Sequence, residues 1–511
     1  MAKAYIIGAG PGGPGLMTLR AVRCLAAADV VLYDRLVDER VLRLARRGAE
    51  LIFVGKSPSA HSMEQDEINA LMIEKAREDK CVVRLKGGDP YVFGRGGEEA
   101  IALREAGIDF EVVPGITAAG ALGAYAGIPL THRALAASVV LATGHEDPAK
   151  GEPQVDWQAL ARAADTIGIY MGVKRLGEIV EKLLSAGLAP ETPAAIVQNC
   201  AAPSQRTVVA TLGEIAGIAE REQIHPPAVT IIGKVVSLRD KLNWFERLPL
   251  FGRKVLVTRA KDQAAELSDI LEELGAYALE IPMIRIEPPE DTRPLDEAVE
   301  NLRRYDWLAF TSVNGVDAFV DRMRALNRDA RALYRIRICC IGPATAARVE
   351  QHFLMVDCIP ERFVSEEIPK AMLKCGTLRE KDILMPRADI ASPDLAERLR
   401  ALGACVTDVV AYRTLPAEFD ADGLFARLRT GEIDAVTLAS ASTARNLAAT
   451  LGWKRIKDIA DKTIFAAIGP VTARAAREAG IPVTIEAAEH TLSGLVQALV
   501  GHFGSEKKEA K

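Results

Sequence analysis

The residues with the clearest chemical potential are glycines placed near an acidic side chain. Gly8, Gly10 and Gly13 lie between a short apolar strand and a helical stretch, and Asp34 ends the next expected strand. This spacing matches a dinucleotide-binding loop, in which backbone N–H groups receive a pyrophosphate. Pro11 lies inside the loop, however, and removes one such N–H group. A tight strand-to-helix turn with no ligand is the second interpretation of these residues.

A second glycine-rich region strengthens the expectation of a ligand site. Residues 86–99 read KGGDPYVFGRGGEE, and residues 112–133 carry further glycines. Glycine permits close backbone approaches that a Cβ would block. We therefore expect several backbone segments to converge here on a common partner.

The C-terminal half contains an internal repeat. Four pairs of sequence blocks recur in one order at offsets of 127 or 128 residues, namely VLVTRA with ILMPRA, LGA at 274–276 with LGA at 402–404, TSVNGV with ASASTA, and IGPATAARV with IGPVTARAA. A repeat this long predicts two similar lobes with a cleft, because solenoid repeats are only about 20–50 residues long.

The elements that must position these residues alternate in type along the chain. Short apolar strands alternate with helical stretches rich in alanine and leucine, which predicts an α/β fold. The 511 residues exceed what one core usually organises. A multidomain protein is therefore expected.

Composition excludes several classes of protein. Hydrophobic residues make up 49%, charged residues 26%, and the net charge is -5, so no nucleic-acid surface is indicated. No signal peptide is expected, and no apolar run approaches the roughly 20 residues that cross a membrane. The eight cysteines are scattered, without a CxxC pair or ligand-spaced histidines, which predicts a reduced, metal-free, cytoplasmic protein.

The N-terminal half resembles uroporphyrinogen-III C-methyltransferase. The matching motifs, in order, are GAGPGGPGLMTL, YDRLV, VGK, KGGDPYVFGRGGEE, VPGIT, AGIPLTHR, TGH, YMG and DKLNWF. The resemblance implies two α/β domains of a tetrapyrrole methylase fold with S-adenosyl-L-methionine held between them. The cofactor-binding positions that it implies are Pro11, Gly87, Gly88, Asp89, Val92, Thr117, Ala118, Met171 and Cys200.

Two of these positions have other interpretations. A carboxylate at Asp89 suits ribose hydroxyl or ammonium donors, but it also suits a cap for a helix beginning near Gly96. Met171 is a soft side chain for an adenine pocket, although an isolated methionine more often packs in a core.

The resemblance also implies the chemistry. A pyrrole carbon attacks the sulfonium methyl group, and a proton then leaves the macrocycle, so the protein supplies alignment and a base. Asp34 matches the proposed base and Lys56 the proposed acid, although Asp34 could simply end a strand. The sequence departs from the family at Gly13, Ser57 and Cys200, and the cysteine could crowd the pocket.

The C-terminal half resembles uroporphyrinogen-III synthase, a bilobal fold whose chain crosses a two-stranded hinge twice. The motifs that carry the resemblance are the repeated blocks together with YDWLAFTSVNG, PRADIASPDLAERLRALGA and YRT. The expected boundaries are 1–245 for the methyltransferase, 246–253 for a linker, 254–503 for the synthase (lobe one 254–284 plus 415–503, lobe two 288–412) and 504–511 for a disordered tail.

The synthase substrate in this family, hydroxymethylbilane, carries several carboxylates, so arginines and hydroxyl groups should bind it. The candidate substrate-binding residues are Arg259, Ser312, Thr345, Arg387, Arg413, Ser440 and Thr472. Each arginine alone could be a surface charge, and the threonines could be helix caps. Tyr412 matches the family's candidate general acid, which assists loss of the terminal hydroxyl group.

Together the resemblances imply a bifunctional enzyme. The C-terminal half would close hydroxymethylbilane to uroporphyrinogen III with inversion of the last ring, and the N-terminal half would transfer two methyl groups to give precorrin-2. A homodimer through the N-terminal half is expected, with no nucleic-acid or membrane partner. Two alternatives are a C-terminal ligand sensor without turnover and an N-terminal nicotinamide oxidoreductase. The sequence leaves open whether precorrin-2 leads to cobalamin or sirohaem.

Overall fold

The computed structural model describes most of the chain, as two compact units. The described residues are 4–46, 48–55, 63–145, 155–417 and 419–509. One unit comprises Met1–Lys254, Ile270–Ala278 and Val500–Lys511, and the other comprises Val255–Asp269 and Leu279–Leu499. Each unit contributes its own sheets and its own cavity.

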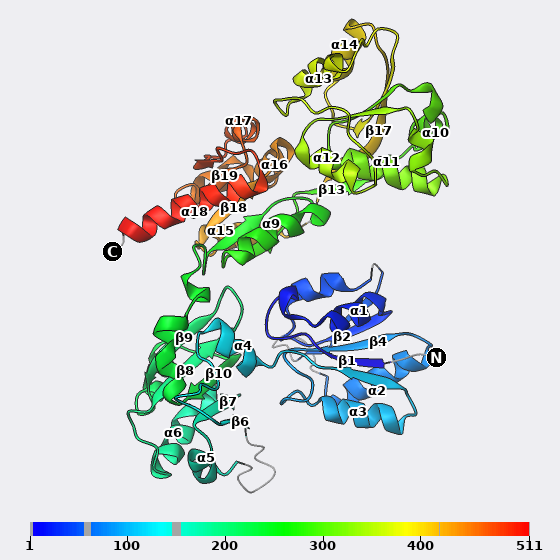
Figure 1. Ribbon diagram of the computed structural model, residues 1–511. Helices are drawn as coiled ribbons and strands as arrows, with labels where there is room; N and C mark the ends of the chain where they lie inside the picture. Colours follow the sequence, from blue (N-terminus) through cyan, green and yellow to red (C-terminus); the bar gives the residue numbers. More distant parts are fainter. Residues whose placement is uncertain (1–3, 47, 56–62, 146–154, 418, 510–511) are drawn as a thin grey trace. The chain divides into compact units, whose positions relative to one another are not determined.

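The first sheet is fully parallel, with strand order β3-β2-β4-β1-β5. Its strands are β1 (Ala4–Gly8), β2 (Val30–Tyr33), β3 (Glu50–Phe53), β4 (Val82–Lys86) and β5 (Phe110–Val113). Its helices are α1 (Leu19–Ala27), α2 (Gln65–Arg77) and α3 (Gly96–Glu105). Helix α1 packs on one face, and α2 and α3 pack on the other (Figure 1). Helices on both faces explain why the central strands are largely apolar, with Arg84 and Lys86 on β4 as the charged exceptions.

The second sheet is mixed, with order β6-β7-β10-β8-β9. Its strands are β6 (Val139–Thr143), β7 (Thr166–Tyr170), β8 (Pro193–Gln198), β9 (Arg206–Thr211) and β10 (Ala228–Ile232). Its helices are α4 (Ala118–Tyr125), α5 (Trp157–Ala163), α6 (Leu176–Ser185), α7 (Ile215–Arg221) and the short α8 (Arg239–Leu242). Only β6 and β7 run parallel, and β10 is antiparallel to both of its neighbours.

The C-terminal repeat appears as two five-stranded sheets, in which four repeat-related strands follow one order, β12-β11-β18-β19 in one sheet and β17-β16-β14-β15 in the other. One has the order β12-β11-β18-β19-β20, and the other has β13-β17-β16-β14-β15. The strands of the first are β11 (Lys254–Val257), β12 (Tyr277–Glu280), β18 (Ala435–Leu438), β19 (Ile464–Ala467) and β20 (Ile485–Glu486). Those of the second are β13 (Ile284–Glu287), β14 (Trp307–Phe310), β15 (Arg337–Cys340), β16 (Asp382–Ala388) and β17 (Cys405–Pro416).

The helices of this half repeat in the same way. They are α9 (Lys261–Glu273), α10 (Arg293–Glu300), α11 (Val313–Ala325), α12 (Pro343–Glu350), α13 (Ile368–Lys374), α14 (Asp394–Ala401), α15 (Ala421–Arg429), α16 (Ala441–Ile459), α17 (Pro470–Glu478) and α18 (Leu492–Glu509). The chain passes between the sheets through an antiparallel pair, β13 with the end of β17. The sequence predicts a disordered tail from residue 504, but α18 continues to Glu509.

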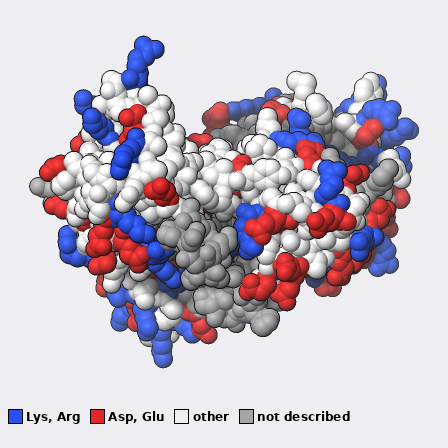
Figure 2. All heavy atoms as spheres, turned by 90° about the horizontal axis from the view of Figure 1, so that it is seen from below, with Lys and Arg blue, Asp and Glu red and all other residues white. Residues whose placement is uncertain are grey.

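Surface properties agree with the composition. On the face shown in Figure 2, cationic and anionic side chains are interspersed. Among the described residues, none of the helices has the length and apolarity needed to span a bilayer.

Candidate active sites

The first unit contains a cavity of about 690 Å³. Loops after β1, β2 and β4 form one side, and residues following β7 and β8 form the other. The carboxyl ends of parallel strands are the usual position of ligands in open α/β sheets. The volume lies within the roughly 300–1,000 Å³ of small-molecule sites.

All of the cofactor positions implied by the sequence lie around this one cavity. They are Pro11, Gly87, Gly88, Asp89, Val92, Thr117, Ala118, Met171 and Cys200. The most distant pair in sequence, Pro11 and Cys200, comes from loops after β1 and β8. The fold therefore assembles in one place a set that spans most of the N-terminal half.

Three glycines pack backbone to backbone beneath the cavity. A Cβ on Gly115 would stand 2.7 Å from the Cα of Gly8 and closer still to the carbonyl oxygen of Gly88. Gly10 and Gly88 also exchange backbone hydrogen bonds of 3.1 and 2.9 Å, and both have positive φ angles. The glycines therefore bring three loops together, which a side chain would prevent.

This packing replaces the dinucleotide interpretation of the first loop. A dinucleotide loop leads directly into a helix whose N-terminus receives the pyrophosphate. Here a single 3₁₀ turn at Pro14–Leu16 follows the glycines, and α1 begins only at Leu19, capped by Thr18. The helix start is displaced from the loop, so the geometry does not favour pyrophosphate binding.

The Asp89 carboxylate connects two of the cavity loops. One oxygen accepts from the N–H groups of Tyr91 and Val92 at 2.8 and 3.2 Å, and the other accepts from the Gly115 N–H at 3.0 Å. Helix α3 instead begins after Arg95, whose side chain makes no capping hydrogen bond. Asp89 therefore does not cap that helix. Its hydrogen bonds instead hold two loops of the cavity wall together.

On the opposite wall, Tyr170 is the last residue of β7 and Met171 follows it. The Tyr170 hydroxyl lies 2.6 Å from the Thr117 hydroxyl and accepts from the Ala119 N–H at 2.7 Å. Burial raises the pKa of Tyr170, which keeps this hydroxyl neutral. Met171 is 51% exposed, so it is not a core side chain.

Cys200 narrows the cavity beside a predicted cofactor contact. Its side chain is buried, and its Sγ lies 3.9 Å from the Ala118 carbonyl oxygen. Burial raises the pKa of the thiol to about 12. The side chain therefore acts as a small neutral group at neutral pH.

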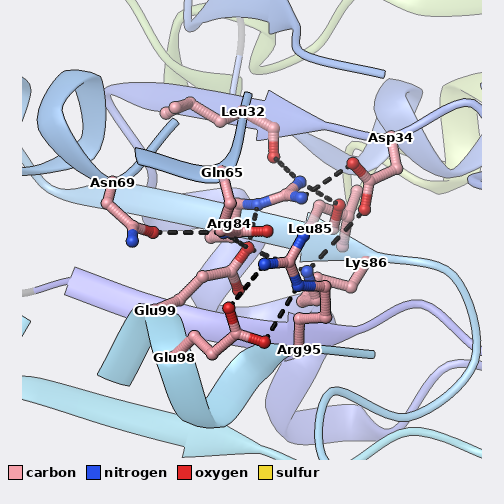
Figure 3. A network of polar contacts seen from close by, with 10 residues as sticks. All are labelled: Leu32, Asp34, Gln65, Asn69, Arg84, Leu85, Lys86, Arg95, Glu98 and Glu99. Atoms are coloured by element: carbon pink, nitrogen blue, oxygen red, sulfur yellow. Dashed lines mark hydrogen bonds and ion pairs between the residues drawn. The ribbon is translucent and has the colours of Figure 1, made fainter. Parts of the chain in front are cut away.

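Asp34 belongs to a buried ionic network that sequence reasoning missed (Figure 3). Arg84 donates to Asp34 at 2.7 Å and to Glu99 at 2.9 Å. Lys86 donates to the same Glu99 oxygen at 2.8 Å and lies 3.9 Å from Asp34. The side chains of Arg84, Lys86 and Glu99 are almost fully buried. Two cations and two carboxylates thus balance one another at the end of β2.

The network also affects proton affinity. Burial, followed by the charge of Arg84, lowers the pKa of Lys86. Burial also disfavours the charged form of Arg84. The negative charges of Glu99 and Asp34 outweigh this effect, so the pKa of Arg84 is raised. A signal existed in the sequence: charged residues two apart in an otherwise apolar strand share one face and need partners when buried. Lys56, the predicted acid, lies outside the described residues.

In the second unit, a cavity of about 290 Å³ contains three of the predicted residues, Ser312, Arg387 and Tyr412. The Tyr412 hydroxyl lies 2.9 Å from the Ser312 hydroxyl. Burial raises the pKa of Tyr412, so its proton is retained beyond ordinary tyrosine titration. A protonated phenol facing a cavity is able to donate to an oxygen placed there.

The repeat-related hydroxyls differ in role. Ser312 and Ser440 cap α11 and α16, accepting from backbone N–H groups at 3.0 and 3.2 Å. Thr345 and Thr472 are buried within the first turns of α12 and α17, where glycines occupy the cap positions. The structure thus assigns the capping role to the serines rather than to the threonines.

Two predicted arginines are already paired. Arg387 donates to both oxygens of Asp408 and, at 2.8 Å, to the Ser392 carbonyl. Arg413, on β17, binds Glu287 at 3.3 Å and also pairs with Glu290. Both guanidinium groups therefore have local structural roles.

Arg259 is different. Burial lowers its pKa, and its Nη1 has no hydrogen-bond partner within the described chain, although Glu266 lies 3.6 Å away. Its Nη2 donates to Gln263 at 3.4 Å, and Gln263 in turn donates to Asn314 at 2.6 Å. Asn314 lies near enough to the Tyr412 hydroxyl to lower its pKa, against the larger effect of burial. A polar chain that the sequence did not reveal thus connects Arg259 with Tyr412.

Comparison with known proteins gives each half a family. Residues 3–216 match the model for tetrapyrrole (corrin/porphyrin) methylases, and residues 265–497 match the model for uroporphyrinogen-III synthase HemD. Within the N-terminal half, an S-adenosyl-L-methionine-dependent uroporphyrinogen III methyltransferase of Methanosarcina barkeri is 51% identical over 240 residues, 47% of this chain and 94% of the relative.

A solved structure of uroporphyrin-III C-methyltransferase from Thermus thermophilus, complexed with S-adenyl homocysteine, is 44% identical, with a TM-score of 0.41. The match covers 46% of this chain and 100% of that one. Porphyrin biosynthesis protein HemD of Ruminiclostridium josui is 38% identical over 496 residues, 97% of both chains. Because that similarity extends over almost the whole length, this chain belongs to the family of the porphyrin biosynthesis protein HemD.

Proposed function

We propose that this chain catalyses two consecutive steps of tetrapyrrole synthesis. The C-terminal half closes hydroxymethylbilane to uroporphyrinogen III, and the N-terminal half methylates that product twice to give precorrin-2. The observation that carries the proposal is the convergence of nine predicted positions on one glycine-floored cavity. Membership of the HemD family and the match to methylases support it.

The cavity residues fit S-adenosyl-L-methionine. Glycine backbones at Gly87 and Gly88 allow a close approach, and Val92 and Met171 offer apolar contacts to an adenine ring. When bound, this cofactor supplies a methyl group activated by its sulfonium. Thr117 and Asp89 shape the walls through the contacts described above.

Asp34 accepts the proton that the macrocycle loses in this proposal. Arg84 fixes one of its oxygens, while the other lies 3.9 Å from Lys86. The carboxylate is therefore oriented without being fully enclosed, and its side chain is 27% exposed. Lys56 remains the proposed acid.

In the C-terminal half, Tyr412 is the proposed acid for loss of the terminal hydroxyl as water. Arg259, whose Nη1 has no hydrogen-bond partner within the described chain and lies 3.6 Å from Glu266, is the strongest of the proposed carboxylate-binding residues. Hydroxyl groups or N–H groups at helix starts are proposed to bind the substrate carboxylates at four further residues, namely Ser312, Ser440, Thr345 and Thr472. We propose that Arg387 and Arg413 also bind the substrate. Their ion pairs with Asp408 and Glu287 hold the two guanidinium groups in position.

One coupled assay tests both steps. The full chain is supplied with hydroxymethylbilane alone, and the type III and spontaneous type I isomers are separated. S-adenosyl-L-methionine is then added, and methylated product is followed by absorbance and mass. A chain that leaves the isomer ratio at its uncatalysed value acts only as a sensor in its C-terminal half. Binding of NAD(H), with no binding of S-adenosyl-L-methionine, would establish the oxidoreductase alternative.

We also propose a homodimer formed through the N-terminal half and a reducing, cytoplasmic location. The first rests on the family resemblance, and the second is supported by eight cysteines that are all free thiols. Light scattering on the purified chain at graded concentrations measures the first. Removal of residues 254–511 should leave the dimer in place.

A further inference from the structure

Three of the cysteines lie together in the C-terminal half. Cys339, at the end of β15, forms a backbone bridge with Cys358. The thiols of Cys339 and Cys375 both lie near enough to the Cys358 thiol to lower its pKa. Cys375, which caps the end of α13, also lies with its Sγ 4.0 Å from the Asp357 carbonyl oxygen. Scattered in sequence, these thiols form a continuous row in space.

The row runs from the core to the surface. Cys339 is fully buried, Cys358 is partly buried and Cys375 is exposed. A reagent in solution therefore meets Cys375 first, and Cys358 is the thiol within reach of it. Among the described residues, no group of His, Cys, Asp and Glu is arranged to hold a metal ion. Thiol–disulfide chemistry is the reactivity that this arrangement supports.

A cation stands beside the two outer thiols. The Arg337 guanidinium donates to the Cys375 carbonyl at 2.7 Å and lies 4.2 Å from the centre of the Trp307 ring. The neighbouring thiol of Cys339, then that of Cys375, and last the charge of Arg337 lower the pKa of Cys358 against the opposing effect of its burial. A thiolate is the reactive form of cysteine, so this setting favours attack by Cys358.

The same two cysteines bracket a segment that reaches the Tyr412 cavity. Between them lie Ser365 and Glu366, which both line that cavity. Phe363, just before them, packs against Gly342, where an added Cβ would meet the ring at 3.3 Å. A bond between Cys358 and Cys375 would close this segment into a ring and fix one wall of the cavity.

We propose that Cys358 and Cys375 form a reversible disulfide that controls the C-terminal active site. The oxidant is a low-molecular-weight disulfide. The Cys375 thiolate attacks one of its sulfurs and releases one small thiol. The Cys358 thiolate then attacks the Cys375 sulfur and releases the second. Two electrons pass from the protein thiols to the oxidant, and two small thiols leave. The control of activity rests on the proposed synthase function, whereas the disulfide itself does not.

The test uses the full chain equilibrated with oxidised and reduced glutathione. Free thiols are alkylated, and linked peptides are identified by mass spectrometry. Ring closure from hydroxymethylbilane and methylation of uroporphyrinogen III are assayed separately on each sample. We expect a Cys358–Cys375 link and a fall in ring closure on the order of tenfold, reversed by dithiothreitol, with methylation unchanged.

Three variants make the result specific. Cys375→Ser, at an exposed position, and Cys358→Ser should each abolish both the link and the oxidative loss. Cys405→Ser, which removes another exposed thiol of this half, should retain both. A link between Cys339 and Cys358 instead, no link, or a link without loss of ring closure overturns the proposal. If the reduced chain shows no ring closure, the proposed synthase function is wrong. The Cys358–Cys375 link is still tested in that case, because mass spectrometry detects it without any activity.

Discussion

The two cavities are built from different parts of the polypeptide. The floor of the N-terminal cavity is backbone, where Gly8 and Gly115 pack against each other and against the Gly88 carbonyl oxygen and leave no room for a side chain. The C-terminal cavity is lined by side chains whose positions depend on partners, such as Arg387 with Asp408. A backbone floor is fixed by sterics, whereas a side-chain wall depends on each ion pair and hydrogen bond around it. The first should fail abruptly on substitution and the second gradually.

The largest expected effect is on stability, from the buried network of the N-terminal half. Arg84→Met leaves Asp34 and Glu99 facing only Lys86, so the free energy of unfolding of the first unit should fall by about 3–5 kcal/mol. Arg413→Met is the matched change in the other half, where the pair with Glu290 is exposed and is worth about 0–1 kcal/mol. Denaturant unfolding of each variant measures both. Equal losses would remove the contrast between the halves.

The next effect is on the backbone floor. Gly115→Ala places a Cβ against Gly8 and Gly88, and overpacking of this kind costs about 1–3 kcal/mol. Methyl transfer and binding of S-adenosyl-L-methionine should fall by roughly tenfold or more, while ring closure is unchanged. Gly120→Ala is the control, because its nearest atom would be 3.7 Å away. Normal cofactor affinity in Gly115→Ala would show that the floor tolerates a side chain.

A graded loss is expected at Tyr412. Tyr412→Phe removes the proposed acid but keeps the ring, so ring closure should slow by on the order of tenfold without stopping. Burial raises the pKa of this phenol above 10.0, so the neutral form favoured by folding is lost only as the pH rises through that higher value. The alkaline decline of ring closure should therefore lie above pH 10 in the parent chain. A decline unchanged in Tyr412→Phe would assign it to another group.

The smallest effect should be at Cys200. Cys200→Gly removes the side chain that narrows the cavity beside Ala118, and the affinity for S-adenosyl-L-methionine should rise about twofold to fivefold. Cys24→Ala, at a buried position on α1 that is not among the cavity-lining residues, should leave the affinity unchanged. Isothermal titration distinguishes the two variants. Weaker binding in Cys200→Gly would mean that the thiol contributes a favourable contact.

The same contrast explains what could be predicted from the sequence. Glycines mark positions where only a bare backbone fits, and the repeated blocks predicted two similar lobes, whose sheets share the order of four repeat-related strands. The Arg84 network was missed because its members come from β4, α3 and the residue just after β2, which only the fold brings together. The pairing of Arg413 with Glu287, 126 residues away in sequence, was hidden for the same reason.

The glycine floor also limits which amino-acid substitutions the N-terminal site can accept during evolution. Where Gly8, Gly88 and Gly115 meet, no neighbouring side chain exists that could shrink to accommodate a larger residue. A single substitution at Gly8 or Gly115 therefore has no simple second-site remedy. Heritable variation in cofactor affinity should accumulate instead at Met171 and Cys200, the side chains lining the cavity away from the floor.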